Sequence, residues 1–82
     1  MWTYNEWYDE LEAAEYGSDL SAKINYGFTN SDLLILLTMH EAGNFREKIE
    51  DLLTDCNFHT ESKLLRKGDY SSMLEQLIEE AG

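Results

Sequence analysis

The chain has 82 residues, of which 43% are hydrophobic, and it contains neither proline nor valine. This length allows one domain with a single modest core, and the apolar content is too high for intrinsic disorder. Seventeen acidic residues against six basic ones give a net charge of −11. Such a charge disfavours direct binding to nucleic acid or to an anionic membrane surface. Abundant Leu, Glu and Ala favour an all-α fold.

The first predicted helix covers residues 4–16. Thr3 and Glu6 have the spacing of a capping box, and Trp2 and Trp7 occupy the two positions of a hydrophobic staple. Gly17 is expected to end this helix. At 100° per residue one face is apolar and is expected to pack inward, and the opposite face is acidic. The apolar face consists of Tyr4, Trp7, Tyr8, Leu11 and Ala14.

A second, short helix is predicted from a cap at Ser18 and Asp19 to about Tyr26, with Gly27 after it. Five consecutive aliphatic residues, 33–37, follow and begin an uncharged, mostly apolar run that extends to residue 39. It leaves no face of a helix polar, so it has to be enclosed. Cap residues before it and Gly43 after it predict a central helix over residues 30–42.

Three further helices are expected after residue 43. The fourth helix is predicted over residues 45–55, with Asn44 as its cap. The fifth is predicted to be capped by Thr60 or Asn57 and to end at Lys67 and Gly68. Asp69 is predicted to cap the last helix. The last helix is expected to turn Tyr70, Met73, Leu74, Leu77 and Ile78 inward. Residues 1–82 are therefore predicted to form one all-α domain, a compact bundle of five or six short helices around the central helix at about 30–42.

No pattern in the chain indicates catalysis. The one cysteine, Cys56, and the two histidines, His40 and His59, are too few for a usual zinc site, and calcium-loop and phosphate-loop patterns are absent. We therefore expect no enzyme activity, no cofactor and no metal, with Cys56 as a small core residue. A single cysteine, no signal-peptide pattern and no apolar run of about 20 residues predict a cytoplasmic protein.

The acidic residues gather at the two ends of the chain. Residues 1–22 and 69–82 contain acids and no base, and the middle is nearly neutral. Like charges three or four residues apart on a helix cost roughly 0.2–0.5 kcal/mol per pair. Acidity that serves only solubility is one explanation, but a solubility surface normally mixes both signs. The alternative is presentation to a positive partner, for which the candidate residues are Glu6, Asp9, Glu10, Glu12, Glu15, Glu75, Glu79 and Glu80.

In size, acidity, helicity and lack of catalytic motifs the chain resembles small acidic phage proteins that disable host defence: DNA mimics directed against restriction enzymes, and many anti-CRISPR proteins. The resemblance implies a non-enzymatic inhibitor, a monomer or homodimer in a bacterial cytoplasm, that blocks a basic, nucleic-acid-handling protein such as a CRISPR effector. Colicin-type immunity proteins are similar in the same general way, but their Asp-x-x-Tyr-Tyr-Pro run is missing here. The alternative function is a small interaction or regulatory module that binds through apolar and aromatic residues.

Overall fold

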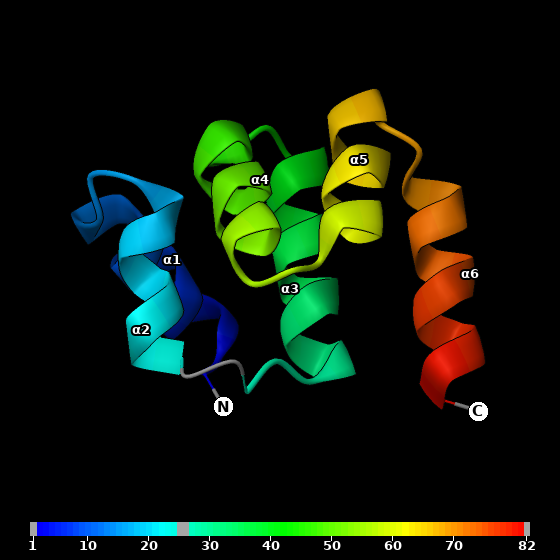
Figure 1. Cartoon of the computed structure of the whole chain (residues 1–82), viewed down its shortest axis with the longest axis horizontal. Helices are drawn as coiled ribbons and strands as arrows, with labels where there is room; N and C mark the ends of the chain where they lie inside the picture. The colour runs from blue at the N-terminus through cyan, green and yellow to red at the C-terminus, as the bar shows by residue number, and fades with distance from the viewer. Residues whose placement is uncertain (1, 25–26, 82) are drawn as a thin grey trace.

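Six α helices and one 3-10 turn follow one another in the computed structural model, which describes residues 2–24 and 27–81, with side chains up to residue 79 (Figure 1). The helices are α1 (Tyr4–Ala13), α2 (Ser21–Ile24), α3 (Asn30–Glu41), α4 (Arg46–Asp55), α5 (His59–Lys67) and α6 (Tyr70–Ala81), and the 3-10 turn η1 is Gly17–Leu20. These residues contain no strand. The radius of gyration, 11.5 Å, agrees with the value of about 12 Å expected for a globular chain of this length. The predicted all-α bundle is confirmed.

Helix α3 is the central element. It packs against α1, α4 and α6, and Figure 1 shows it between the N-terminal helices and α6. Leu33, Leu36, Leu37 and Met39 are all buried. The run is thus largely enclosed, with Ile35 partly buried, but Leu34, which is 45% exposed, and the polar Thr38 face solvent.

Three helices begin as their cap residues predict. At α1 the Thr3 amide donates to the Glu6 carboxylate (3.0 Å) and the Glu6 amide donates to the Thr3 hydroxyl (3.3 Å), which completes the capping box. Thr29 and Asp32 form the same arrangement at α3. At α6 the Ser72 amide donates to Asp69. The staple is present too, since the Trp2 and Trp7 rings lie 4.7 Å apart.

Three helices end in the same motif, in which a residue with positive φ follows the helix and the next amide reaches back across six residues. After α3 the Asn44 amide donates to Met39 O (2.9 Å), and after α4 the Phe58 amide donates to Leu53 O (2.8 Å). After α5 the Asp69 amide donates to Leu64 O (2.9 Å). The residues with positive φ at these three helix ends are Gly43, Asn57 and Gly68. This is the Schellman motif, and it closes each helix before the chain turns.

The predicted caps of α4 and α5 are wrong. Phe45 and Phe58 are the cap residues, and neither makes a side-chain cap hydrogen bond. Asn44 and Asn57 serve the ends of the preceding helices instead. The phenylalanine rings pack inward, Phe45 4.9 Å from Tyr8 and Phe58 5.1 Å from Phe28. Aromatic contacts of this kind offset a missing cap.

The first helix ends at Ala13, three residues before the predicted end. Ala14 and Tyr16 have extended backbones, and this turn brings Gly17 onto α4. The predicted cap of the second helix is also wrong. The Asp19 carboxylate accepts from the Tyr16 amide (3.0 Å), so it caps the start of the 3-10 turn η1 instead. Helix α2 ends at Ile24; Tyr26, the predicted end, lies outside the described residues.

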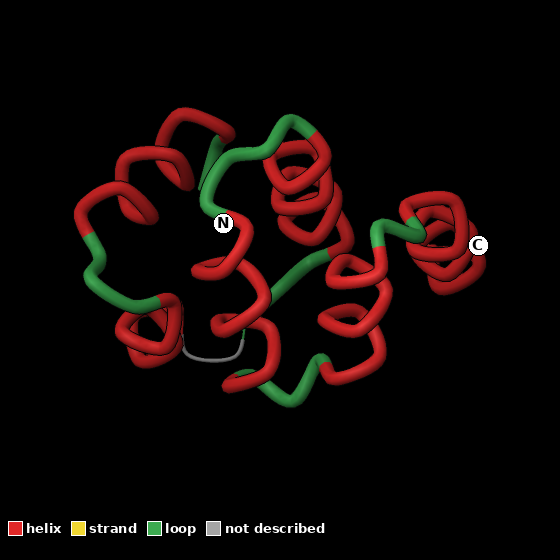
Figure 2. The backbone as a smooth tube through the Cα atoms, turned by 90° about the horizontal axis from the view of Figure 1, so that it is seen from above, coloured by secondary structure: helices red, strands yellow, loops and turns green. Residues whose placement is uncertain are grey.

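The predicted inward faces are correct at Trp7, Leu11, Met73 and Leu77, which are all buried. They are wrong at three residues, which remain exposed: Tyr4 (41%), Leu74 (38%) and Ile78 (69%). Figure 2 shows α6 at one edge of the bundle. Its main contacts are with α3 and α5, so its apolar arc is wider than the area that its neighbours cover.

Candidate functional site

The acids of α1 face solvent, as predicted, and they differ in what they contact. Asp9 and Glu12 are exposed. Glu6 is exposed as well, but its carboxylate is bound to the Thr3 amide. The hydrogen bonds from the Thr3 backbone and then from its hydroxyl lower the pKa of Glu6. Glu6 therefore stabilises the start of α1 while it adds to the negative surface.

Glu10 has a basic partner that the sequence pattern did not reveal. Lys23 Nζ lies 3.0 Å from Glu10 Oε2. The two residues are 13 positions apart, and α2 brings them together. The expectation of an acidic array without a neighbouring base is thus wrong at this position. Because the Lys23 side chain is 61% exposed, the pair adds at most about 1 kcal/mol to stability.

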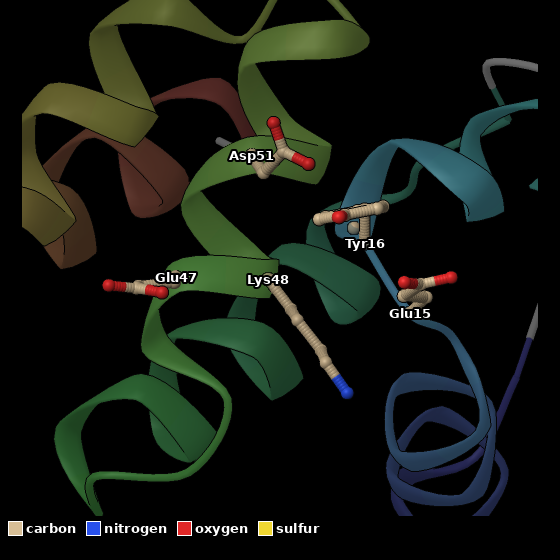
Figure 3. A pocket seen from close by; sticks show the side chains of 6 residues that line it. Glu15, Tyr16, Glu47, Lys48 and Asp51 are labelled. Carbon is tan, nitrogen blue, oxygen red and sulfur yellow. The ribbon is translucent and has the colours of Figure 1, made fainter.

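An acidic cleft of about 390 Å³ opens beyond the end of α1, between residues 15–17 and α4. Its lining residues are Glu15, Tyr16, Gly17, Glu47, Lys48 and Asp51. In Figure 3 the Tyr16 ring extends toward α4, and Glu15 lies on the N-terminal side of the cleft, across from α4. Glu47 points away from the cleft. The carboxylates surround the cleft without converging on one point. They present a negative field rather than a set of ligands for one ion.

The single base of the cleft is occupied. Lys48 Nζ donates to Leu11 O at the end of α1 (2.9 Å) and lies 5.4 Å from the centre of the Phe45 ring. A cation at the carboxyl end of a helix opposes the negative end of its dipole. Asp51 in turn accepts from the Ser18 amide (3.0 Å). Both contacts join the N-terminal segment to α4.

Glu47 and Asp51 were missed by the sequence analysis. They lie more than 30 residues after Glu15 and follow a near-neutral stretch of chain. Only the packing of η1 on α4 brings them beside Glu15. No local pattern could have revealed this.

The C-terminal acids belong to another part of the molecule. Glu75 and Glu79 are exposed on α6, and the side chain of Glu80 lies outside the described residues. Helices α1 and α6 lie at opposite ends of the longest dimension in both views, with α3, α4 and α5 between them (Figures 1 and 2). The two acidic arrays therefore do not form one surface.

His40 occupies a buried polar network rather than an open site. Its Nδ1 lies 2.8 Å from the Tyr70 hydroxyl, and its Nε2 lies 2.7 Å from Glu50 Oε2. Arg66 Nε donates to the other Glu50 oxygen (3.3 Å). With both ring nitrogens engaged and only 3% of the residue exposed, His40 is not available to a substrate or metal. The network instead joins α3, α4, α5 and α6.

Cys56 is buried, as predicted. Burial and then the charge of Asp55 raise the pKa of its thiol, which disfavours the reactive thiolate. His59 is exposed. Among the side chains that the structure describes, no three His, Cys, Asp or Glu residues are grouped as a metal site would require.

Cys56 should consequently react slowly with a thiol-specific reagent at neutral pH. We expect labelling of the folded protein to be at least about tenfold slower than labelling of the same protein in denaturant, because the reaction waits for local opening and for thiol deprotonation. Mass spectrometry over a time course measures both rates. Equal rates would show that the thiol is accessible in the native state.

Comparison with protein-family models, curated protein sequences and solved structures gives no match for this chain. No helix in residues 2–24 or 27–81 combines the length and the apolar character needed to cross a membrane.

Proposed function

We propose that this chain is a non-enzymatic inhibitor that binds a basic, nucleic-acid-handling protein through one acidic surface. This surface consists of Glu6, Asp9, Glu10, Glu12, Glu15, Glu47 and Asp51. The observation that carries the proposal is that Glu47 and Asp51 of α4 lie beside Glu15, in the segment that directly follows α1 and its four acids. Bound there, the partner loses access to its nucleic acid. A phage anti-CRISPR protein or another anti-defence DNA mimic, acting on a target such as a CRISPR effector, is the class that this description fits.

Physical chemistry supports a basic macromolecule as the partner. Carboxylates spaced by helical turns offer Lys and Arg side chains the same charge as a row of phosphates, and such a field accelerates association. The acids around the cleft point in different directions (Figure 3), which suits several basic side chains better than one bound cation. Glu6 and Glu10 are already engaged, so Asp9 and Glu12 carry most of the available charge on α1.

The first experiment is a pull-down from a bacterial lysate with the immobilised chain, at about 0.05 M and about 0.5 M salt, which span weak and strong screening. We expect a defined basic, nucleic-acid-binding protein at low salt and much less of it at high salt. The purified partner should then lose nucleic-acid binding when the chain is added. Recovery of abundant proteins alone, without a basic one, would contradict the proposal.

Reversal of two charges on α1 tests the surface itself. The variant carrying both Asp9→Lys and Glu12→Lys should bind that partner roughly tenfold or more weakly. Its melting temperature should stay the same or rise slightly, because position 9 becomes opposite in charge to Glu6 and position 12 places a cation at the negative end of the α1 dipole. Titration calorimetry and thermal unfolding measure the two effects.

The matched control carries Glu75→Lys and Glu79→Lys on α6. Each double variant changes four units of charge, from −11 to −7, so only the location differs. The control should retain the affinity of the wild-type chain within a few-fold. Equal losses in both variants would indicate a response to net charge alone, and no loss in either would leave the acidity as a solubility feature.

The alternative function, binding through apolar and aromatic residues, is not favoured at the N-terminus. Trp7 is fully buried, and Trp2 and Tyr8 pack against the core. These three rings stabilise the fold, and the exposed aromatic residues of this part of the chain are two separate tyrosines, Tyr4 (41%) and Tyr16 (61%). The exposed aliphatic residues lie at the other end of the molecule, on α3 and α6.

A further inference from the structure

An apolar groove of about 210 Å³ runs between α3 and α6, away from the acidic surface. Its lining residues are Asn30, Ser31, Leu34, Leu74, Leu77 and Ile78. Leu34, Leu74 and Ile78 are the exposed large aliphatic side chains of the described residues, with 45%, 38% and 69% of their area accessible. All three line this one groove. Scattered single apolar residues are normal on a surface, but a contiguous set indicates a contact surface.

The groove has a fixed base. Helices α3 and α6 run antiparallel, so that the start of α3 lies near the end of α6 (Figure 1). Asn30 Nδ2 donates to Leu77 O (3.2 Å) and ties the two helices together there. Leu77, which is 5% exposed, belongs both to the groove lining and to the core. The groove is therefore preformed, which reduces the entropic cost of binding.

The charges beside the groove are all of one sign. Exposed Glu75 lies three residues before the groove residue Ile78, on the same side of α6, and exposed Glu79 lies one turn after Glu75. Neither α3 nor α6 contains Lys or Arg. An apolar floor with an acidic edge is complementary to a ligand that has an apolar stripe with basic residues beside it.

We propose that this groove binds an amphipathic basic helix of a partner protein, with Leu-type side chains every three or four residues in the groove and Lys or Arg facing Glu75 and Glu79. A second copy of this chain fits poorly. Pairing α6 with its own copy would set these acids against each other with no base on either helix, and like charges across an interface oppose binding. This contact is separate from the acidic surface of α1 and does not depend on the proposed inhibitor function.

A designed peptide probes the groove. It has about 18 residues of Leu and Lys, roughly five helical turns, with Leu on one face. One control peptide has the same composition in an order that gives no apolar face, and a second has Glu in place of Lys. We expect fluorescence anisotropy to show binding of the first peptide and binding at least roughly tenfold weaker for both controls.

Two variants of the chain locate the binding site. The combined change Leu34→Ser and Ile78→Ser should weaken peptide binding roughly tenfold or more, and Tyr4→Ser, an exposed apolar position on α1, should leave it unchanged. Both groove positions are exposed, so the fold should survive, as thermal unfolding will check. The pair Glu75→Lys and Glu79→Lys should also weaken peptide binding, whereas Asp9→Lys with Glu12→Lys should change it only a few-fold.

Three results would overturn this proposal. The first is equal binding of the amphipathic and reordered peptides, which would indicate charge attraction without a groove. The second is wild-type peptide affinity in the Leu34→Ser, Ile78→Ser variant. The third is a dimer in sedimentation equilibrium that this variant abolishes, which would make a second copy the occupant. None of these results bears on the binding of a basic protein at α1.

Discussion

Replacement of Trp7 by alanine is expected to lower the free energy of unfolding by about 3–5 kcal/mol for the lost side chain, and by a further 1–3 kcal/mol or so for a lost hydrogen bond. Trp7 is fully buried and contacts the rings of Trp2 and Phe28, at 4.7 and 5.7 Å between ring centres. Since small domains are stable by about 5–15 kcal/mol, this change removes much of the total.

The hydrogen bond in question joins the Trp7 indole N–H to Asp32 Oδ1 (3.0 Å). Asp32 is 1% exposed. Burial alone raises the pKa of its carboxyl, but the hydrogen bonds from Trp7 and from the amide and hydroxyl of Thr29 outweigh burial, and the net pKa is lowered. Without the indole, a buried carboxylate loses a donor, which is costly.

The variant Trp7→Phe separates the two effects because it keeps a ring and removes the donor. Since the pKa of Asp32 is lower in the folded protein than in the unfolded chain, its ionised form stabilises the fold above the unfolded-state pKa. This contribution is lost as the pH falls through the folded-state pKa. The stability difference between wild type and Trp7→Phe should therefore shrink as the pH is lowered through that range.

Denaturant unfolding at neutral pH and at several acidic pH values measures these differences. Trp7→Ala is expected to be clearly less stable than Trp7→Phe at neutral pH. A stability difference for Trp7→Phe that does not change between neutral and acidic pH would show that the indole does not support the charge of Asp32. A mild effect of Trp7→Ala would contradict its place in the core.

Substitution of Gly17 by alanine is expected to destabilise the fold by more than about 4 kcal/mol, or to prevent folding, because the new methyl group has no space. A Cβ atom at Gly17 would lie 1.8 Å from Lys48 O and 2.8 Å from the Leu52 amide nitrogen. Both are backbone atoms of α4, which cannot rotate away as a side chain can. Helix α4 and η1 would have to separate, and with them the acidic cleft would be lost.

Two other glycines provide the controls. Gly43 and Gly68 have φ values of +88° and +75°, but a Cβ atom at either would meet no close neighbour. Gly43→Ala and Gly68→Ala should therefore cost only the strain of a left-handed residue, roughly 1–2 kcal/mol each. Circular dichroism and denaturant unfolding compare the three variants. If Gly17→Ala were as stable as the controls, the close contact of η1 with α4 would be wrong.

The sequence by itself determined the features that depend on residues within one helical turn of each other. The cap at Thr3 forms as its spacing to Glu6 predicts, Asp69 caps the last helix as predicted, and Thr29 is the cap among the cap residues before the central helix. The central helix lies where its apolar run and its flanking residues indicate, and Gly43 and Gly68 follow the ends of α3 and α5. Local hydrogen bonds and helical periodicity need no knowledge of the other elements, so they can be read from a few neighbouring residues.

Only the tertiary structure decided the features that depend on which surfaces meet. The contact of Gly17 with α4 ends α1 early and places Glu15 beside Glu47 and Asp51. The packing of the Phe45 and Phe58 rings, without a side-chain cap hydrogen bond, marks the starts of α4 and α5. The position of α6 at the edge leaves Ile78 exposed and separates the acidic ends of the chain. These contacts join residues far apart in the chain, and their geometry follows from packing of the whole core, which no local pattern encodes.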